Sequence, residues 1–138
     1  MSITSKDKEI LICINSPKGN HFFAQFEPFR DSLAMTTHSP VVAQQMLENG
    51  YNNILLLDLE NKEQHKDLFQ AHYQKIIIIE GNILECGLAV DVCKSYTKGP
   101  IYVVRTKKRF VHPRLYQSIG ASYVIFTNNE NDITFIFK

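Results

Sequence analysis

The sequence predicts an α/β domain with a doubly wound, mainly parallel sheet of about six strands, helices on both faces and an antiparallel edge strand at the C-terminus. The main observation is that short aliphatic runs recur along the chain, each ending at a polar residue and followed by a helix-like stretch. Strands buried on both faces read as continuous apolar runs because neither side meets water. The 138 residues fit one domain, so we expect a single unit spanning residues 1–138.

The first strand is predicted at about residues 9–15, and it leads through residues 16–20 into a short aromatic-rich helix. A weaker strand pattern covers residues 32–37, and we expect this strand near an edge of the sheet. The aromatic helix carries four phenylalanines whose close spacing favours core packing over an exposed patch. They are Phe22, Phe23, Phe26 and Phe29.

The second helix has clear start and stop signals. Ser39 suits the N-cap because its hydroxyl oxygen can accept from an orphan amide of the helix start, and Pro40 suits the first helical position because it has no amide hydrogen to leave unpaired. Asn49 and Gly50 mark the end of the helix. The residues expected to form its buried stripe are Val41, Val42, Met46 and Leu47.

The second half of the chain repeats the alternation of strand and helix. Strands are predicted at residues 53–59, 75–80, 101–106 and 122–127, separated by a polar amphipathic helix, a helix at 83–97 and a short helix at 112–119. Residues 128–132 then look like a turn, and residues 133–137 alternate like a strand. A parallel crossover needs about a dozen residues, so this last strand is predicted to form an antiparallel hairpin at the sheet edge.

Two parts of the chain resemble a known family. Residues 32–37 followed by 39–60 resemble the second and third strands of the CheY-like receiver domains of bacterial response regulators, and residues 99–106 and 118–126 resemble the later receiver strands with their Gly-Ala turn. In that family the third strand ends in an aspartate that accepts a phosphoryl group. The resemblance places Asp58 there.

Receiver chemistry also uses an acidic pair after the first strand, a Ser or Thr and a lysine. The first strand ends here in Asn15-Ser16, without a carboxylate, while Lys107 or Lys108 falls near the lysine position. The resemblance therefore implies a degenerate pseudo-receiver. Mg²⁺ is expected only if Asp58 is phosphorylated, with Asp58 as its ligand, and no other cofactor or metal is expected.

A second register competes with the first. Counting back from the Gly120-Ala121 turn places Glu80 at the phosphoacceptor position, Thr106 at the hydroxyl position and Thr127 where the lysine belongs. One extra βα unit relative to a receiver, with a terminal hairpin replacing the last helix, reconciles the two registers.

Three functions remain open. The leading hypothesis is a non-enzymatic signalling module of the two-component type, which acts through a protein partner or a homodimer and could regulate transcription. The second is a working receiver phosphorylated on Asp58. The third is a small α/β enzyme or nucleotide-binding protein that uses the crevice at the strand ends, with the residues Ser16, Asp58, Glu80 and Thr106.

Two local patterns bear on binding. Residues 16–20 invite comparison with phosphate-binding loops but lack GxGxxG and GxxxxGK[ST]. A basic patch follows the fifth predicted strand, yet no helix-turn-helix signature accompanies it, and nucleic-acid binding by this chain is not expected. The basic patch consists of Arg105, Lys107, Lys108, Arg109, His112 and Arg114.

Composition limits the classes of protein further. The 15 Lys and Arg residues nearly balance the 14 Asp and Glu residues, so no overall attraction to nucleic acid or to an anionic membrane is expected. The three cysteines form no CxxC pair and are expected to be reduced core residues. No aliphatic run approaches the ~20 residues of a membrane span, so we expect a cytoplasmic protein without membrane contact.

Overall fold

Six parallel strands form one sheet in the computed structural model, which describes residues 10–56, 73–79, 83–94, 97, 99–105, 113–118 and 120–137. The order across the sheet is β3-β2-β1-β4-β5-β6. The strands are β1 (Ile10–Ile14), β2 (Leu33–Thr37), β3 (Ile54–Leu56), β4 (Lys75–Ile79), β5 (Ile101–Arg105) and β6 (Tyr123–Phe126). The predicted α/β class and the parallel pairing of these six strands are confirmed.

The chain reverses its direction of travel across the sheet at β1. This strand pairs with β2 on one side, Ile12 opposite Met35, and with β4 on the other, Ile12 opposite Ile77. Such an order is that of Rossmann-type folds, whereas receiver domains have the five-strand order 2-1-3-4-5. The strand that comes before Asp58 in sequence is β3, and β3 is an edge strand.

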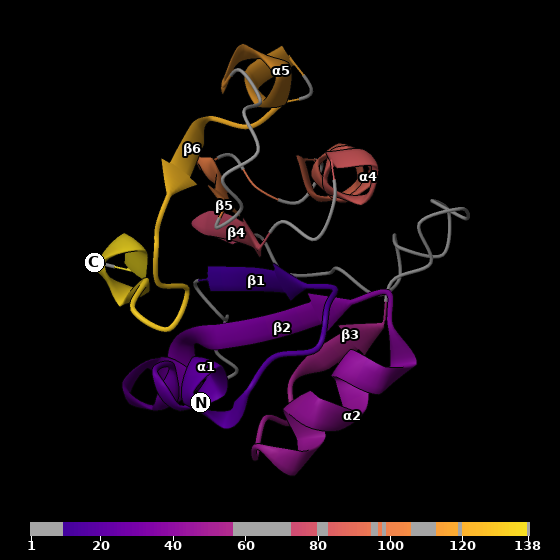
Figure 1. Ribbon diagram of the computed structural model, residues 1–138. Coiled ribbons are helices and arrows are strands. Elements are labelled where there is room, and N and C mark those ends of the chain that lie inside the picture. Colours follow the sequence, from indigo (N-terminus) through magenta and orange to yellow (C-terminus); the bar gives the residue numbers. More distant parts are fainter. Residues whose placement is uncertain are drawn as a thin grey trace, which may run out of the picture.

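Helices cover both faces of the sheet, as predicted (Figure 1). On one side lie α1 (Asn20–Ala24), α2 (Pro40–Glu48) and the 3₁₀ helix η4 (Thr134–Phe137), and on the other lie α4 (Ile83–Cys93) and α5 (Pro113–Ser118). A second 3₁₀ helix, η1 (Glu27–Ser32), joins α1 to β2.

The capping signals of α2 are confirmed. The Ser39 hydroxyl oxygen accepts a hydrogen bond from the Val42 amide at 3.3 Å, and Gly50 has the positive φ of 88° that ends the helix. Of the predicted stripe, however, only Val42 and Met46 are buried. Val41 and Leu47 are 62% and 54% exposed, because α2 lies over β2 and the edge strand β3, where only one side of the helix is covered.

The helix α4 is shorter than predicted. It ends at Cys93 instead of residue 97, and Leu88 is exposed. The small residues Ala89 and Val90 are buried against the sheet instead.

Alternate residues of β1 supply two core layers. Ile12 and Ile14 pack with the phenylalanines of α1, while Leu11 and Cys13 pack against α4. The ring centroids of Phe22 and Phe23 are 5.5 Å apart in an edge-to-face arrangement. The four phenylalanines therefore belong to the core, as predicted, with Phe29 half-buried at its border.

The strand β2 corrects one expectation. Its five residues are all buried, and it has a paired strand on each side, so it lies inside the sheet and not near an edge. Ala34, Thr36 and Thr37 made the run look polar and weak. The two threonines are buried in the sheet.

The predicted C-terminal hairpin is wrong. Thr134–Phe137 form η4, which packs on the same face as α1, and the described part of β6 pairs with β5 only. Ile133, Ile136 and Phe137 are buried while Phe135 is exposed. The buried residues Ile133 and Ile136 are three positions apart, as in a 3₁₀ helix. The alternation of apolar residues and threonine in the sequence therefore did not indicate a strand.

Candidate functional site

The carboxyl ends of β1 and β4 form the switch point of the sheet, where doubly wound folds bind their ligands. The β1–α1 turn (residues 15–19) lies at this point. In dinucleotide-binding folds this turn contacts the pyrophosphate through backbone amides.

The Asn15 side chain joins the ends of β1 and β2. Its Oδ1 atom accepts hydrogen bonds from the His38 amide at 2.9 Å and from the Thr37 hydroxyl at 3.2 Å. The Thr37 hydroxyl in turn accepts one from the Ser39 amide at 3.1 Å. The carboxyl ends of β1 and β2 are thus joined by the chain's own polar groups.

The backbone of Lys18 is held by a side chain of α2. The Lys18 amide donates to Gln45 Oε1 at 3.1 Å, and Gln45 Nε2 donates to the Lys18 carbonyl oxygen at 3.1 Å. Pro17 has no amide hydrogen to donate. Two consecutive backbone positions of the turn are therefore closed to an anion.

The Lys18 ammonium group pairs with a carboxylate from the far end of the chain. Its Nζ lies 2.9 Å from Glu130 Oε2 and 5.5 Å from the centroid of the Phe22 ring. The side chains of Lys18 and Glu130 are only 10% and 29% exposed. Partial burial makes this a stronger pairing than a surface ion pair, because less water screens it.

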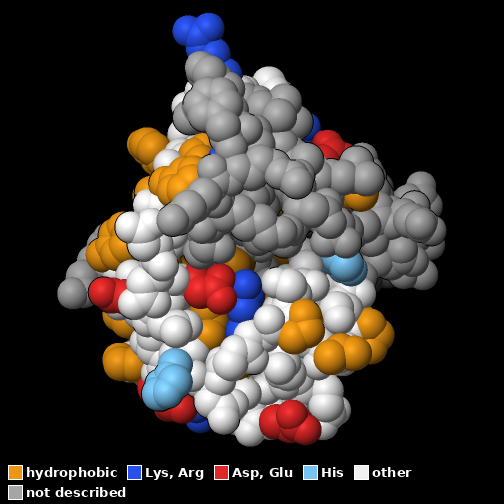
Figure 2. Space-filling model, in the orientation of Figure 1, with side chains coloured by type: hydrophobic (Ala, Val, Ile, Leu, Met, Phe, Trp, Pro, Cys, Tyr) orange, Lys and Arg blue, Asp and Glu red, His pale blue; other side chains and the backbone are white. Residues whose placement is uncertain are grey.

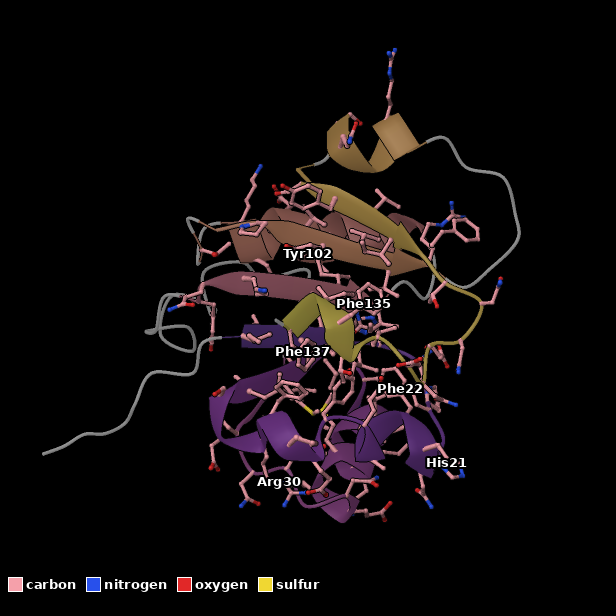
Figure 3. All side chains as sticks on the ribbon, turned by 90° about the vertical axis from the view of Figure 1, so that its left-hand side faces the viewer. His21, Phe22, Arg30, Tyr102, Phe135 and Phe137 are labelled. Carbon is pink, nitrogen blue, oxygen red and sulfur yellow. The ribbon has the colours of Figure 1, made fainter. Side chains whose placement is uncertain are left out.

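Gln25 fixes the C-terminal segment (residues 127–137) beside the turn. Gln25 Nε2 donates to the backbone oxygens of Glu130 and Phe22, both at 2.9 Å, and Gln25 Oε1 accepts from the Ile133 amide at 2.8 Å. Further along, Lys75 Nζ donates to the Ile136 carbonyl oxygen at 2.8 Å. Figure 3 shows η4 lying over the sheet, with Phe137 on the side of α1.

The predicted site residues are mostly not placed. Asp58, Glu80, Thr106, Lys107 and Lys108 lie outside the described residues, so the structure tests neither of their registers.

Thr127, the second register's substitute for lysine, is described and has a local role. Its amide donates to the Arg105 carbonyl oxygen at 2.9 Å, and its hydroxyl oxygen accepts from the Asn129 amide at 3.1 Å. The hydroxyl therefore shapes the turn after β6.

The prediction of a basic patch is in part wrong. Arg105 is 2% exposed, and its guanidinium carbon lies 5.3 Å from the centroid of the Phe126 ring. Arg114 is exposed on α5, while the other four members lie outside the described residues. Arg105 belongs to the interior because it ends a central strand, so it is unavailable to a phosphate backbone.

The described cysteines are structural, as predicted. Cys13 and Cys93 are buried free thiols. Burial, followed by the nearby Cys13, raises the pKa of the Cys93 thiol well above its ordinary value, so it stays protonated and unreactive. Within the described residues, no group of three or more His, Cys, Asp or Glu side chains could hold a metal ion.

A separate hollow of about 170 Å³ lies near the amino ends of β2 and β3. Arg30 and Tyr51 line it, with the guanidinium carbon 4.9 Å from the centroid of the tyrosine ring. Ligands of doubly wound folds bind at the carboxyl ends of the strands, so this hollow lies at the other end of the sheet from the candidate site.

Comparisons with known proteins agree on the fold. No protein-family model matches the chain, and no curated protein matches its sequence. The TrkA-N domain of the Escherichia coli inner membrane protein YbaL matches at a TM-score of 0.65 and 15% identity, over 97% of this chain and 98% of that one. The RCK domain of GsuK matches at a TM-score of 0.64 and 18% identity, over 90% of this chain.

The GsuK matches include a channel bound to NAD, with a TM-score of 0.65 and 18% identity, and a form bound to ADP. The chain spans 27% of the length of the first GsuK chain and 22% of the NAD-bound one. At these identities the likeness establishes the fold and not the function.

These findings correct the receiver hypothesis. The fold is that of RCK and TrkA-N domains, so the interpretation as a pseudo-receiver of a two-component system is wrong, and with it the inference of transcription regulation. The resemblance misled because removal of the edge strand β3 from this sheet leaves the receiver order. Among the sequence-based hypotheses, the nucleotide-binding α/β protein agrees best with the fold.

The turn residues do not fit a dinucleotide. Six residues separate β1 from the second residue of α1, and they align with GxGxxG without a gap. The three glycine positions hold Asn15, Pro17 and Asn20, while Gly19 falls where any residue is allowed. The glycines normally permit a tight turn, close approach of the pyrophosphate and close packing of the helix.

Two further features of a dinucleotide site are missing from the described residues. β2 ends in Thr37-His38, where a carboxylate would hold the ribose hydroxyls. The helix α1 has only five residues and no side-chain N-cap, so it offers a weak dipole to a phosphate. Sequence reasoning noted the absent glycines but missed Gln25, Gln45 and Glu130, because no local pattern links Lys18 to a residue 112 positions away.

Proposed function

We propose that this chain is a non-catalytic regulatory domain with an RCK/TrkA-N-type fold, which controls a membrane transport protein through protein contacts. The match over nearly the whole of the YbaL TrkA-N domain carries the proposal. The GsuK matches support it, since that protein is a channel with an RCK domain.

The candidate site supports a role without catalysis. Its polar groups bond to one another, as in the pairs Asn15 with His38, Lys18 with Gln45 and Lys18 with Glu130. Catalytic groups need a partner in the substrate, and a group that is already satisfied within the protein is a poor acid, base or nucleophile. NAD and ADP are ligands of GsuK, and their use at this turn is not part of the proposal.

The edge strand β6 supplies the best surface for a partner. Three exposed aromatic residues surround this edge, Tyr123 and Phe126 on opposite faces of β6 and Phe135 on η4, and we call them the β6 surface; they are 54%, 55% and 56% exposed. The Tyr123 ring stacks on Tyr102 with the centroids 5.1 Å apart, so the aromatic surface continues into β5. Figure 2 shows hydrophobic side chains gathered on this flank.

Edge strands with exposed aromatic residues are interaction surfaces, because both their backbone groups and their apolar side chains gain from a neighbour. We therefore propose assembly of two copies through the β6 surface, in line with the homodimer expected from the sequence. The transport protein is the second partner in this proposal.

A cytoplasmic location is part of the proposal. No described helix has the length and apolar character that a membrane crossing requires. The buried free thiols Cys13 and Cys93 suit a reducing compartment.

Sedimentation over a range of concentrations tests the assembly. We expect the protein to form dimers, and Tyr123→Ser combined with Phe135→Ser to weaken them by at least ~10-fold, which corresponds to ~1.4 kcal/mol. Val41→Ser combined with Leu47→Ser is the matched control, because it removes two equally exposed apolar residues from α2. A protein that stays monomeric, or a control that weakens the dimer equally, would contradict the proposal.

A further inference from the structure

We infer that the dinucleotide position of this fold is closed in cis by the C-terminal segment, so that the domain keeps its closed form without NAD or ADP. Folds of this type bind dinucleotides at this position, but the residues present here do not fit a dinucleotide. Two sets of contacts carry the inference: those that hold the backbone and the ammonium group of Lys18 in the β1–α1 turn, and those that fasten the C-terminal segment beside it.

Two backbone positions in the middle of the turn offer no free amide. A pyrophosphate at this turn needs backbone amides that point into open space. The Lys18 amide instead donates to Gln45, and Pro17 has none. Gln45 Nε2 also donates to the Lys18 carbonyl oxygen, so the two hydrogen bonds close a ring between the turn and α2.

The positive charge of the turn is also used. Lys18 is the cation of the turn, and Glu130 neutralises it at 2.9 Å in a setting that leaves the Lys18 side chain only 10% exposed. An anionic ligand would have to displace this carboxylate and leave it without its partner. Breaking a largely buried ion pair is costly because one charge stays uncompensated.

The C-terminal segment is fastened along its length. Gln25 holds the backbone of Glu130 and Ile133, and Lys75 holds the Ile136 carbonyl. Phe137 stacks on Phe26, with centroids 5.3 Å apart and rings 13° from parallel. Figure 3 shows Phe137 and Phe22 on the same side of the sheet, with the segment between β6 and α1.

This inference goes beyond the proposed function, and its failure would be distinguishable. If NAD or ADP binds at the turn, closure in cis is wrong, while the dimer formed through the β6 surface is tested separately by sedimentation. If the protein is monomeric and binds neither nucleotide, the proposed assembly fails and the closure stands.

Calorimetric titration of the whole chain with NAD and with ADP is the first test. We expect no saturable heat with either nucleotide up to ~1 mM, which is a bound of about 4 kcal/mol on any binding free energy. Saturable binding of either nucleotide would overturn the inference. Lys18→Met, which keeps the aliphatic stem over Phe22, is titrated in parallel and is expected to behave like the wild type.

Thermal unfolding of Glu130→Gln is the second test. Loss of the carboxylate leaves Lys18 without its counter-charge, and we expect the unfolding midpoint to fall by ~3–6 °C. Asp132→Asn is the matched control, because it removes the same charge from an exposed position two residues along the same segment. Equal midpoints for the two variants would overturn the fastening role of Glu130.

Discussion

The β1–α1 turn and the β6 surface differ in whether their side chains have partners within the chain. At the turn, side chains from distant parts of the chain satisfy one another, and Lys18 is 10% exposed. At the β6 edge of the sheet, Tyr123, Phe126 and Phe135 are each more than half exposed. The difference teaches that a fold associated with ligand binding can keep its sheet and lose its ligand crevice, while an exposed edge remains for partners.

The difference has a simple physical origin. A polar group in a crevice must be satisfied by ligand, water or protein, and here protein groups do this without an external molecule. An apolar group at an edge gains free energy only from another surface. The contacts at the β1–α1 turn therefore stabilise the isolated chain, whereas the exposed β6 surface favours association with a partner.

The largest expected effect comes from the apolar contact beneath the C-terminal segment. Phe26 is fully buried between Phe22 and Phe137, so Phe26→Ala should lower the free energy of unfolding by ~3–5 kcal/mol. Urea denaturation measures the change. The control is Phe135→Ala in the same segment, where an exposed ring should cost less than ~0.5 kcal/mol. Equal losses of stability in the Phe26 and Phe135 variants would contradict the distinction between the buried contact beneath the C-terminal segment and the exposed β6 surface.

A smaller effect is expected at the polar contact between the same elements. Gln25→Ala removes three hydrogen bonds and should lower stability by ~2–3 kcal/mol, since partly buried groups lose their partners. Hydrogen exchange of the Ile133 amide should accelerate at the same time. Gln44→Ala, at an exposed position of α2, should change neither quantity. Unchanged exchange at Ile133 in the Gln25 variant would argue against the fastening of the segment.

Cys93 lies on the face of the sheet that α4 covers, and it provides a pH test that is independent of the β1–α1 turn and the β6 surface. Burial raises the pKa of Cys93 well above 9.0, so the folded state keeps the proton while the unfolded state releases it. Stability should be fully present below pH 9 and decline as the pH rises further. Urea midpoints from pH 7 to 11 measure the decline, which Cys93→Ala should reduce. Tyr51 and Tyr73, whose pKa values are also raised by burial, contribute above pH 10.0. A flat profile would be the contrary result.

The smallest expected effect is at the turn's glycine. Gly19 has an ordinary φ of −79°, and a Cβ atom added there would meet nothing within 4 Å. Gly19→Ala should therefore change stability by less than ~0.5 kcal/mol. Gly120→Ala is the contrast, because Gly120 has a φ of 115° and Val90 lies 3.0 Å from the added atom. A large loss at Gly19 would show that this turn still needs its glycine.

Much of the fold could be predicted from the sequence, because a run such as residues 75–79 is apolar enough to be a strand only if both faces are buried. The capping of α2 by Ser39 was equally readable, since the signal is local. Strand order is not a local property. A buried run indicates that neighbours exist but not which ones, and so β2 was expected near an edge and the sheet was taken for that of a receiver.

The candidate site was harder to predict for the same reason. The lack of a GxGxxG pattern around residues 16–20 was visible in the sequence, and it weakened the case for a phosphate loop. What replaces the ligand was not visible, because Glu130 and Gln25 meet only after the chain has crossed the sheet. The pattern at residues 133–137 even suggested a strand, which would have carried Glu130 away from Lys18.

The most direct test of closure in cis is a titration of the ¹⁵N-labelled protein with NAD and with ADP, followed by amide chemical shifts. The amides of Lys18, Gly19 and Asn20 are the ones that a pyrophosphate at the turn would contact. Closure by Gln45 and Glu130 predicts that these three signals stay in place at millimolar nucleotide. Saturable shifts that centre on Lys18, Gly19 and Asn20 would contradict it.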